Sequence, residues 1–194
     1  MTSPGGVNTW PIVIHRMFSL PVSLPVRGAD GLAKRAVYGG VERQRLSSQI
    51  NSRELAAGVF YLPVVIDLGQ LRKNCAGWSD VEVAKVVGWL VKSVATVTPA
   101  AMLGSTAPFT DPGEVVVEVT NGQPVNAMGA FERPVAPTLD ASVVAFNHHM
   151  QRVWSMIGHP AKVLHLSEFI DSKASSPAVQ RLADAVANAV PAMA

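Results

Sequence analysis

Residues 58–68 read GVFYLPVVIDL, and this stretch decides the fold that the sequence predicts. β-Branched and aromatic residues dominate it, and such residues favour strands because their side chains pack well on a pleated sheet. Pro63 lies inside the stretch and has no backbone N–H to donate, which argues for an edge strand or a bulge. We therefore predict a strand here, at the edge of a sheet.

Other stretches on both sides of it also predict strands. Residues 11–20 (PIVIHRMFSL) place alternate side chains on two faces. Residues 114–120 (EVVVEVT) precede an Asn-Gly turn signal, which predicts a hairpin with residues 123–131 as the partner strand. A short strand is expected over residues 161–166.

Three later segments predict helices, because apolar residues recur in them at helical spacing. Ser79 and Glu82 begin the first of these with the S-x-x-E spacing of a capping box. The three predicted helices cover residues 79–97, residues 139–157 and a last stretch that Ser176 caps and that begins at Pro177.

The order of these segments predicts one α+β domain over residues 1–194. We expect a mainly antiparallel sheet with helices on one face, compatible with a ferredoxin-like β-α-β-β-α-β core. The RNA-recognition fold belongs to this class, although its aromatic signature is missing from this sequence.

Composition narrows the function classes. Hydrophobic residues make up 48% of the chain and charged residues only 15%, which suggests that partners cover part of the surface.

Cys75 is the only cysteine, so no disulfide or cysteine metal site is expected, and the protein fits a reducing cytoplasm. No apolar run reaches the roughly 18 residues of a membrane span, and the first residues lack a signal-peptide pattern.

The net charge of +2 is small for a nucleic-acid-binding protein, but its distribution is uneven. Only Asp30 and Glu42 oppose the basic residues that come before Glu54. The basic residues of this first quarter are Arg16, Arg27, Lys34, Arg35, Arg43, Arg45 and Arg53.

Residues 38–49 (YGGVERQRLSSQ) are the most informative segment for function. The two glycines permit close backbone approach, and the two arginines point the same way if the chain is extended. The two serines can cap a following helix, whose amides attract phosphate. The segment thus suits a sugar-phosphate backbone. The residues alone nevertheless favour the plainer interpretation of a glycine turn, a solvated basic strand and an ordinary helix cap.

Three blocks of the sequence, which follow one another in the same order as in a known family, give the chain a family resemblance. Residues 38–49 resemble the N-terminal signature of the backbone subunit of Cascade, the CRISPR type I surveillance complex, with type I-E the nearest match. Residues 52–61 (SRELAAGVFY) and 66–71 (IDLGQL) resemble the family's S-S-G-V-F-Y strand and its I-N-L-x-Q-L continuation. Residues 99–109 (PAAMLGSTAPF) resemble the loop before the family's next strand.

The resemblance implies an RNA-recognition-like palm with no catalytic residue, metal or cofactor. Copies would assemble head-to-tail as a helical filament along the guide RNA (crRNA), beside other Cascade subunits, and present the guide to target DNA in antiviral defence. The RNA-contact residues that it implies are Gly39, Gly40, Arg43, Arg45, Ser47, Ser48 and Gln49, the neighbouring Lys34 and Arg35, and Met102 and Ser105 in the later loop.

The sequence departs from the family pattern in three places. The family has a helical insert and a thumb between the positions of Gln49 and Ser52, and this sequence has neither. Met102 stands where the family often has lysine, and Val41 and Glu42 stand where basic residues are usual. The expected phosphate-binding surface is therefore less positive than in the family.

Two alternatives remain beside this prediction. His15, on a strand beside Arg16, could act as the general acid or base of a metal-independent endonuclease that processes CRISPR guide RNA. The chain could instead be an interaction module that binds no nucleic acid. His148 and His149 are adjacent and diverge by about 100° on a helix, so they do not form a zinc pair.

Overall fold

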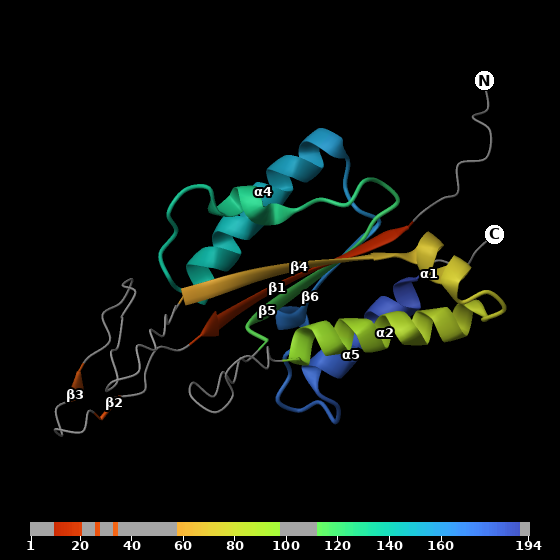
Figure 1. Cartoon of the computed structure of the whole chain (residues 1–194), viewed down its shortest axis with the longest axis horizontal. Helices are drawn as coiled ribbons and strands as arrows, with labels where there is room; N and C mark the ends of the chain where they lie inside the picture. Colours follow the sequence, from red (N-terminus) through yellow and green to blue (C-terminus); the bar gives the residue numbers. More distant parts are fainter. Residues whose placement is uncertain (1–9, 21–25, 28–32, 35–57, 98–111, 191–194) are drawn as a thin grey trace, which may run out of the picture.

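The computed structural model describes residues 10–20, 26–27, 33–34, 58–97 and 112–190. Its main sheet contains four strands in the order β4-β1-β5-β6, and every neighbouring pair is antiparallel (Figure 1). Two short strands, β2 and β3, form a separate pair. The strands are β1 (Pro11–Leu20), β2 (Val26–Arg27), β3 (Ala33–Lys34), β4 (Gly58–Asp67), β5 (Glu114–Val119) and β6 (Lys162–His165).

Helices cover both faces of the main sheet. Figure 1 shows α2 and α5 on one side of it and α4 on the other. Short helical segments follow β4, precede α4 and follow β6. The bounds are α1 (Leu68–Asn74), α2 (Asp80–Thr96), η1 (Ala127–Phe131), α4 (Leu139–Ile157), η2 (Leu166–Phe169) and α5 (Ala178–Ala189).

The predicted α+β class and antiparallel sheet are confirmed, but the expectation of helices on one face only is wrong. Ile12 and Ile14 of β1 belong to the apolar core under α2 and α5, whereas Met17 belongs to the second core under α4. All six residues of β5 are buried as well. Because both faces of these central strands are apolar, both faces need a covering layer.

Within the described part of the chain, the order of elements also differs from the β-α-β-β-α-β order that we expected. Strands β4 and β5 are both antiparallel to β1, so they run parallel to each other with β1 between them. The chain from β4 through α2 to β5 is therefore a split β-α-β unit. Among the described elements, the four strands β1 to β4 all precede α1 along the chain.

Local signals predicted most elements well. The bounds of β1 and α4 are those predicted, and β4 lies at the sheet edge as Pro63 indicated. The strand expected over residues 123–131 is wrong. Asn126 accepts a hydrogen bond from the Met128 N–H (2.9 Å) and begins the 3-10 turn η1 instead. The helix α1 was not predicted.

Ser79 forms the predicted capping box of α2. Its hydroxyl accepts from the Glu82 N–H (3.3 Å), and the Glu82 carboxylate accepts from the Ser79 N–H (2.8 Å). These bonds satisfy two donors that the first turn leaves without helical partners.

We expect Ser79→Ala to lower the free energy of unfolding by about 1 kcal/mol, because the helix loses the Ser79 hydroxyl as a capping acceptor for the Glu82 N–H. Chemical denaturation followed by circular dichroism measures this loss. Ser93→Ala is the matched control, since Ser93 is exposed in the same helix and makes no cap. Equal losses in the two variants would contradict the role of the cap.

Candidate functional site

Nearly all of the predicted RNA-contact residues lie outside the described part of the chain. Lys34 lies in β3, where its backbone pairs with Val26. The other predicted residues fall within residues 35–57 and 98–111. They are Arg35, Gly39, Gly40, Arg43, Arg45, Ser47, Ser48, Gln49, Met102 and Ser105, and the position of the family's insert falls in the first of these ranges.

The described ends of these two segments meet at one end of the main sheet. β1 ends at Leu20, which pairs with Gly58 at the beginning of β4. Met17 pairs with Glu114 at the beginning of β5. Residues 21–57 and residues 98–111 are therefore both attached at the same end of β1 (Figure 1).

Arg16 is a buried cation at this end of the sheet, with only 1% of its surface exposed. Its guanidinium Nη1 donates to the carbonyl oxygens of Val94 (2.9 Å) and Val97 (2.7 Å) at the C-terminus of α2. A positive charge is favourable there, because the last helical carbonyls carry partial negative charge. Burial lowers the pKa of Arg16, but an arginine stays protonated in proteins.

Gly113 lies where the chain re-enters β5 after residues 98–111. Its φ of +59° is in the left-handed region that glycine adopts without strain. A Cβ atom at this position would clash with the carbonyl oxygen of Met17. The backbone of residue 113 can therefore approach β1 closely only because it has no side chain.

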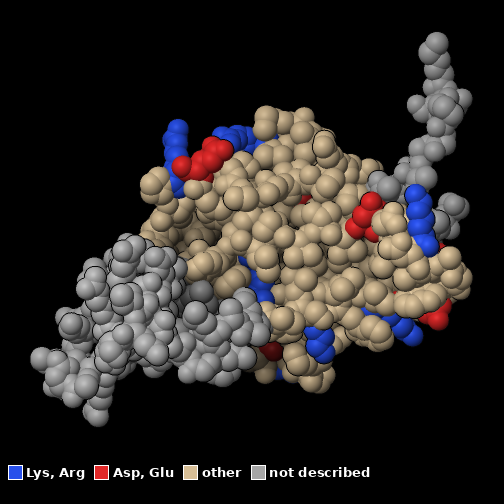
Figure 2. Space-filling model, in the orientation of Figure 1, with Lys and Arg blue, Asp and Glu red and all other residues tan. Residues whose placement is uncertain are grey.

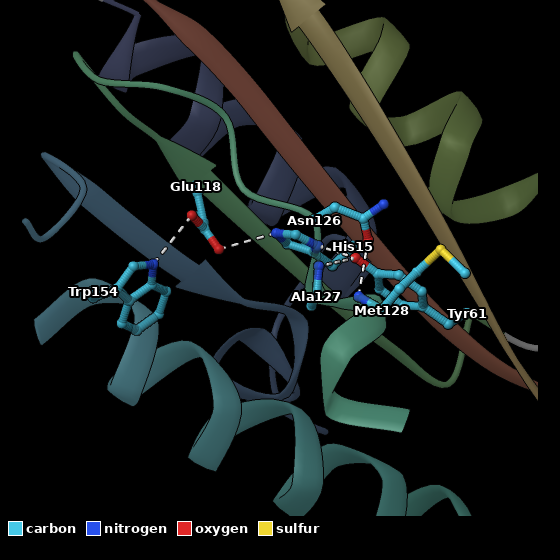
Figure 3. Close-up of polar contacts among 7 residues, drawn as sticks. All are labelled: His15, Tyr61, Glu118, Asn126, Ala127, Met128 and Trp154. Carbon is cyan, nitrogen blue, oxygen red and sulfur yellow. Dashed lines mark hydrogen bonds and ion pairs between the residues drawn. The ribbon is translucent and has the colours of Figure 1, made fainter. Parts of the chain in front are cut away.

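A second buried polar cluster lies on the α4 face of the sheet (Figure 3). His15 Nε2 lies 2.9 Å from Glu118 Oε1, and His15 Nδ1 lies 2.7 Å from the Tyr61 hydroxyl. The Trp154 Nε1–H donates to the other Glu118 oxygen (3.3 Å), and the Ala127 N–H donates to the Tyr61 hydroxyl (3.1 Å). The cluster thus ties β1, β4, β5, η1 and α4 together.

One arrangement of protons satisfies the whole cluster. A neutral His15 donates from Nε2 to the Glu118 carboxylate, and its Nδ1 accepts the hydroxyl proton of Tyr61. His15 is 0% exposed and Glu118 is 2% exposed. Both ring nitrogens are engaged with other side chains and neither faces solvent, so the geometry gives no support to His15 as a general acid or base acting on RNA.

A groove of about 760 Å³ lies beside this cluster, near the beginning of β4. Tyr61 and Phe131 form part of its wall, and a proline-containing turn (Arg133–Pro137) forms another part. Its lining is mostly apolar, so it lacks the rows of basic side chains that bind phosphates.

Positive charge is unevenly distributed: the described residues outside β2 and β3, here called the described body, are balanced in charge, whereas residues 21–57 carry an excess of basic residues. Within residues 10–20, 58–97 and 112–190 the sequence has ten Lys or Arg and ten Asp or Glu residues. In residues 21–57 it has six Lys or Arg against three Asp or Glu. On the face of the described body that Figure 2 shows, acidic and basic side chains are both present and most of the surface is uncharged.

The described residues contain neither a group of metal ligands nor a membrane-spanning helix. In that part of the chain, no three His, Cys, Asp or Glu side chains lie close enough together to hold a metal ion. Over the same residues, no helix has the length and hydropathy needed to cross a membrane. Trp89 of α2 is 65% exposed.

The buried cluster predicts how the protein responds to high pH. Burial raises the pKa of Tyr61 to about 12, from an ordinary value of 10.0. The folded state therefore holds the phenol proton more tightly than the unfolded state does. The resulting stability is present below pH 10 and is lost as the pH rises from about 10 to about 12.

Tyr38→Phe leaves Tyr61 as the only tyrosine, so the ultraviolet absorbance of its phenolate can be titrated alone. We expect a midpoint near 12 in the folded protein and near 10 in denaturant. A folded midpoint near 10 would show that the Tyr61 hydroxyl is not held inside the cluster.

The fold recurs in solved structures. A chain of a CRISPR RNA-guided surveillance complex superposes with a TM-score of 0.63 at 16% identity, over 92% of this chain and 99% of that one. A chain of a pre-nicking CRISPR RNA-guided surveillance complex gives 0.58 at 17% identity, over 92% of this chain and 46% of that one. No curated protein matches the sequence.

The sequence also matches the family model of CT1975-like proteins over residues 49–188, which is more than half of the chain. This range includes two of the three blocks on which the family resemblance was based. That resemblance is confirmed, and the chain belongs to the family of CT1975-like proteins.

Proposed function

We propose that this chain is a non-catalytic crRNA-binding subunit of a CRISPR Cascade complex. One observation carries the proposal: the two segments that resemble the RNA-contact blocks of Cascade backbone subunits are attached at the same end of the sheet. Leu20 and Gly58 flank the first segment, and Glu114 begins the strand that follows the second. Both structural neighbours belong to complexes described as RNA-guided, which supports this assignment.

The division of charge supports contact with the RNA backbone. Phosphate contacts come from basic side chains and backbone amides, and they position a protein without reading bases. The described body has no excess of positive charge, so binding would fall to residues 21–57. Arg43 and Arg45 are the central candidates there.

The described surface supports assembly with partners. Several large apolar side chains are more than half exposed, among them Trp78, Val81, Trp89, Val144, Met156, Ile157 and Ile170. In the proposed complex these would face other copies packed head-to-tail along the crRNA, other Cascade subunits, or both. The complex would work in the cytoplasm, where the guide meets target DNA, and another subunit would supply any cleavage.

We expect wild-type protein to purify with RNA of defined length, and the double variant Arg43→Ala, Arg45→Ala to lose most of it. The slope of log affinity against log salt should fall by roughly 1.4, since each lost single-strand phosphate contact contributes ~0.7. Fluorescence anisotropy with a labelled guide RNA at several salt concentrations measures the slope.

The matched control is Lys85→Ala, Lys162→Ala, which removes the same charge from exposed positions of the described body. Its salt slope should equal that of the wild type. Equal losses in both double variants would indicate only a general attraction to RNA. RNA-free wild-type protein that stays monomeric at low salt would exclude the proposed function.

A further inference from the structure

We propose that Arg16 is a positioning residue: it holds the described ends of both predicted RNA-contact segments in one fixed arrangement without touching RNA. This inference rests on the proposed function for its biological meaning, but its geometry stands on described residues alone. Arg16 is 1% exposed, so an RNA strand on the surface cannot reach its guanidinium.

Arg16 first fixes the point where residues 98–111 begin. Its Nη1 donates to the carbonyls of Val94 and Val97, and Val97 is the last described residue before that segment. One side chain of β1 therefore sets where the end of α2 lies against the sheet. Water could satisfy these carbonyls equally well, but it would not tie the helix end to β1.

Arg16 also acts on both ends of residues 21–57 through an aromatic pair. Its guanidinium carbon lies 4.8 Å from the centre of the Phe18 ring, within the range of a cation–π contact. Phe18 stacks on Phe60 with ring centres 5.7 Å apart. Phe18 lies two residues before the end of β1, and Phe60 lies two residues after the beginning of β4.

Gly113 completes the arrangement at the far end of residues 98–111. Because it has no side chain, its backbone lies directly against Met17, the residue after Arg16. All four described ends of the two segments thus converge on β1 residues 16–20. A rigid arrangement matters for binding, because contacts that are already in place cost less conformational entropy when RNA binds.

The first test measures the arrangement without RNA. In a Cys75→Ser background, Ser47→Cys and Ser105→Cys carry nitroxide labels, and pulsed electron resonance gives the distribution of distances between them. Arg16→Met should broaden or shift this distribution. Arg16→Lys should restore much of it, since an ammonium can still donate to the two carbonyls. An unchanged distribution in Arg16→Met would overturn the proposal.

The second test measures RNA affinity in proteins without labels. Arg16→Met should weaken guide-RNA binding about tenfold or more and lower the salt slope, because misplaced segments make fewer phosphate contacts. Arg152→Met removes one charge from an exposed site and should bind like the wild type. Leu182→Ala opens the core between α2 and α5 and controls for lost stability. It should melt earlier but bind RNA normally.

The two tests separate the inference from the proposed function. If wild-type protein binds no RNA but the label distances still respond to Arg16→Met, the proposed function fails and the positioning role stands. If RNA binds and Arg16→Met binds it as the wild type does, Arg16 does not position the contact residues. A loss of affinity in Leu182→Ala equal to that in Arg16→Met would reduce the role of Arg16 to general stability.

Discussion

The structure depends on the burial of residues 11–18 of β1 inside a three-layer fold. Ile12 and Ile14 pack beneath α2 and α5, while His15 and Met17 face α4. Any polar atom on such a strand must find a partner inside the protein, because an unsatisfied buried group is costly. This constraint explains why His15 and Arg16, two buried polar residues of the strand, are centres of hydrogen bonding.

His15 and Arg16 find their hydrogen-bond partners on opposite sides of the sheet. The His15 cluster ties the sheet to α4 and η1, on the face away from α2. Arg16 ties the sheet to the end of α2, where the segments predicted to bind RNA are attached. β1 thus connects both layers of helices to the end of the sheet that we propose binds the guide. The described body is nearly neutral, and the excess of positive charge lies in residues 21–57.

The environment of His15 could not be predicted from the sequence. A histidine beside an arginine on a strand is compatible with acid–base chemistry on RNA, and nothing in its neighbourhood along the chain argues otherwise. Its partners Tyr61 and Glu118 lie 46 and 103 residues away in sequence. Their hydrogen bonds and the burial of the ring could not be foreseen, because they arise only when three strands pair.

The sequence by itself determined the features that depend on neighbouring residues. These include the bounds of β1 and α4, the capping box of Ser79, the edge position indicated by Pro63, and the family resemblance of short blocks. Only the tertiary structure decided three features: which faces are covered, that residues 123–131 contain the 3-10 turn η1 instead of a paired strand, and that distant segments attach at one end of the sheet. Those outcomes depend on strand register and packing between residues far apart in sequence, and local patterns do not encode such contacts.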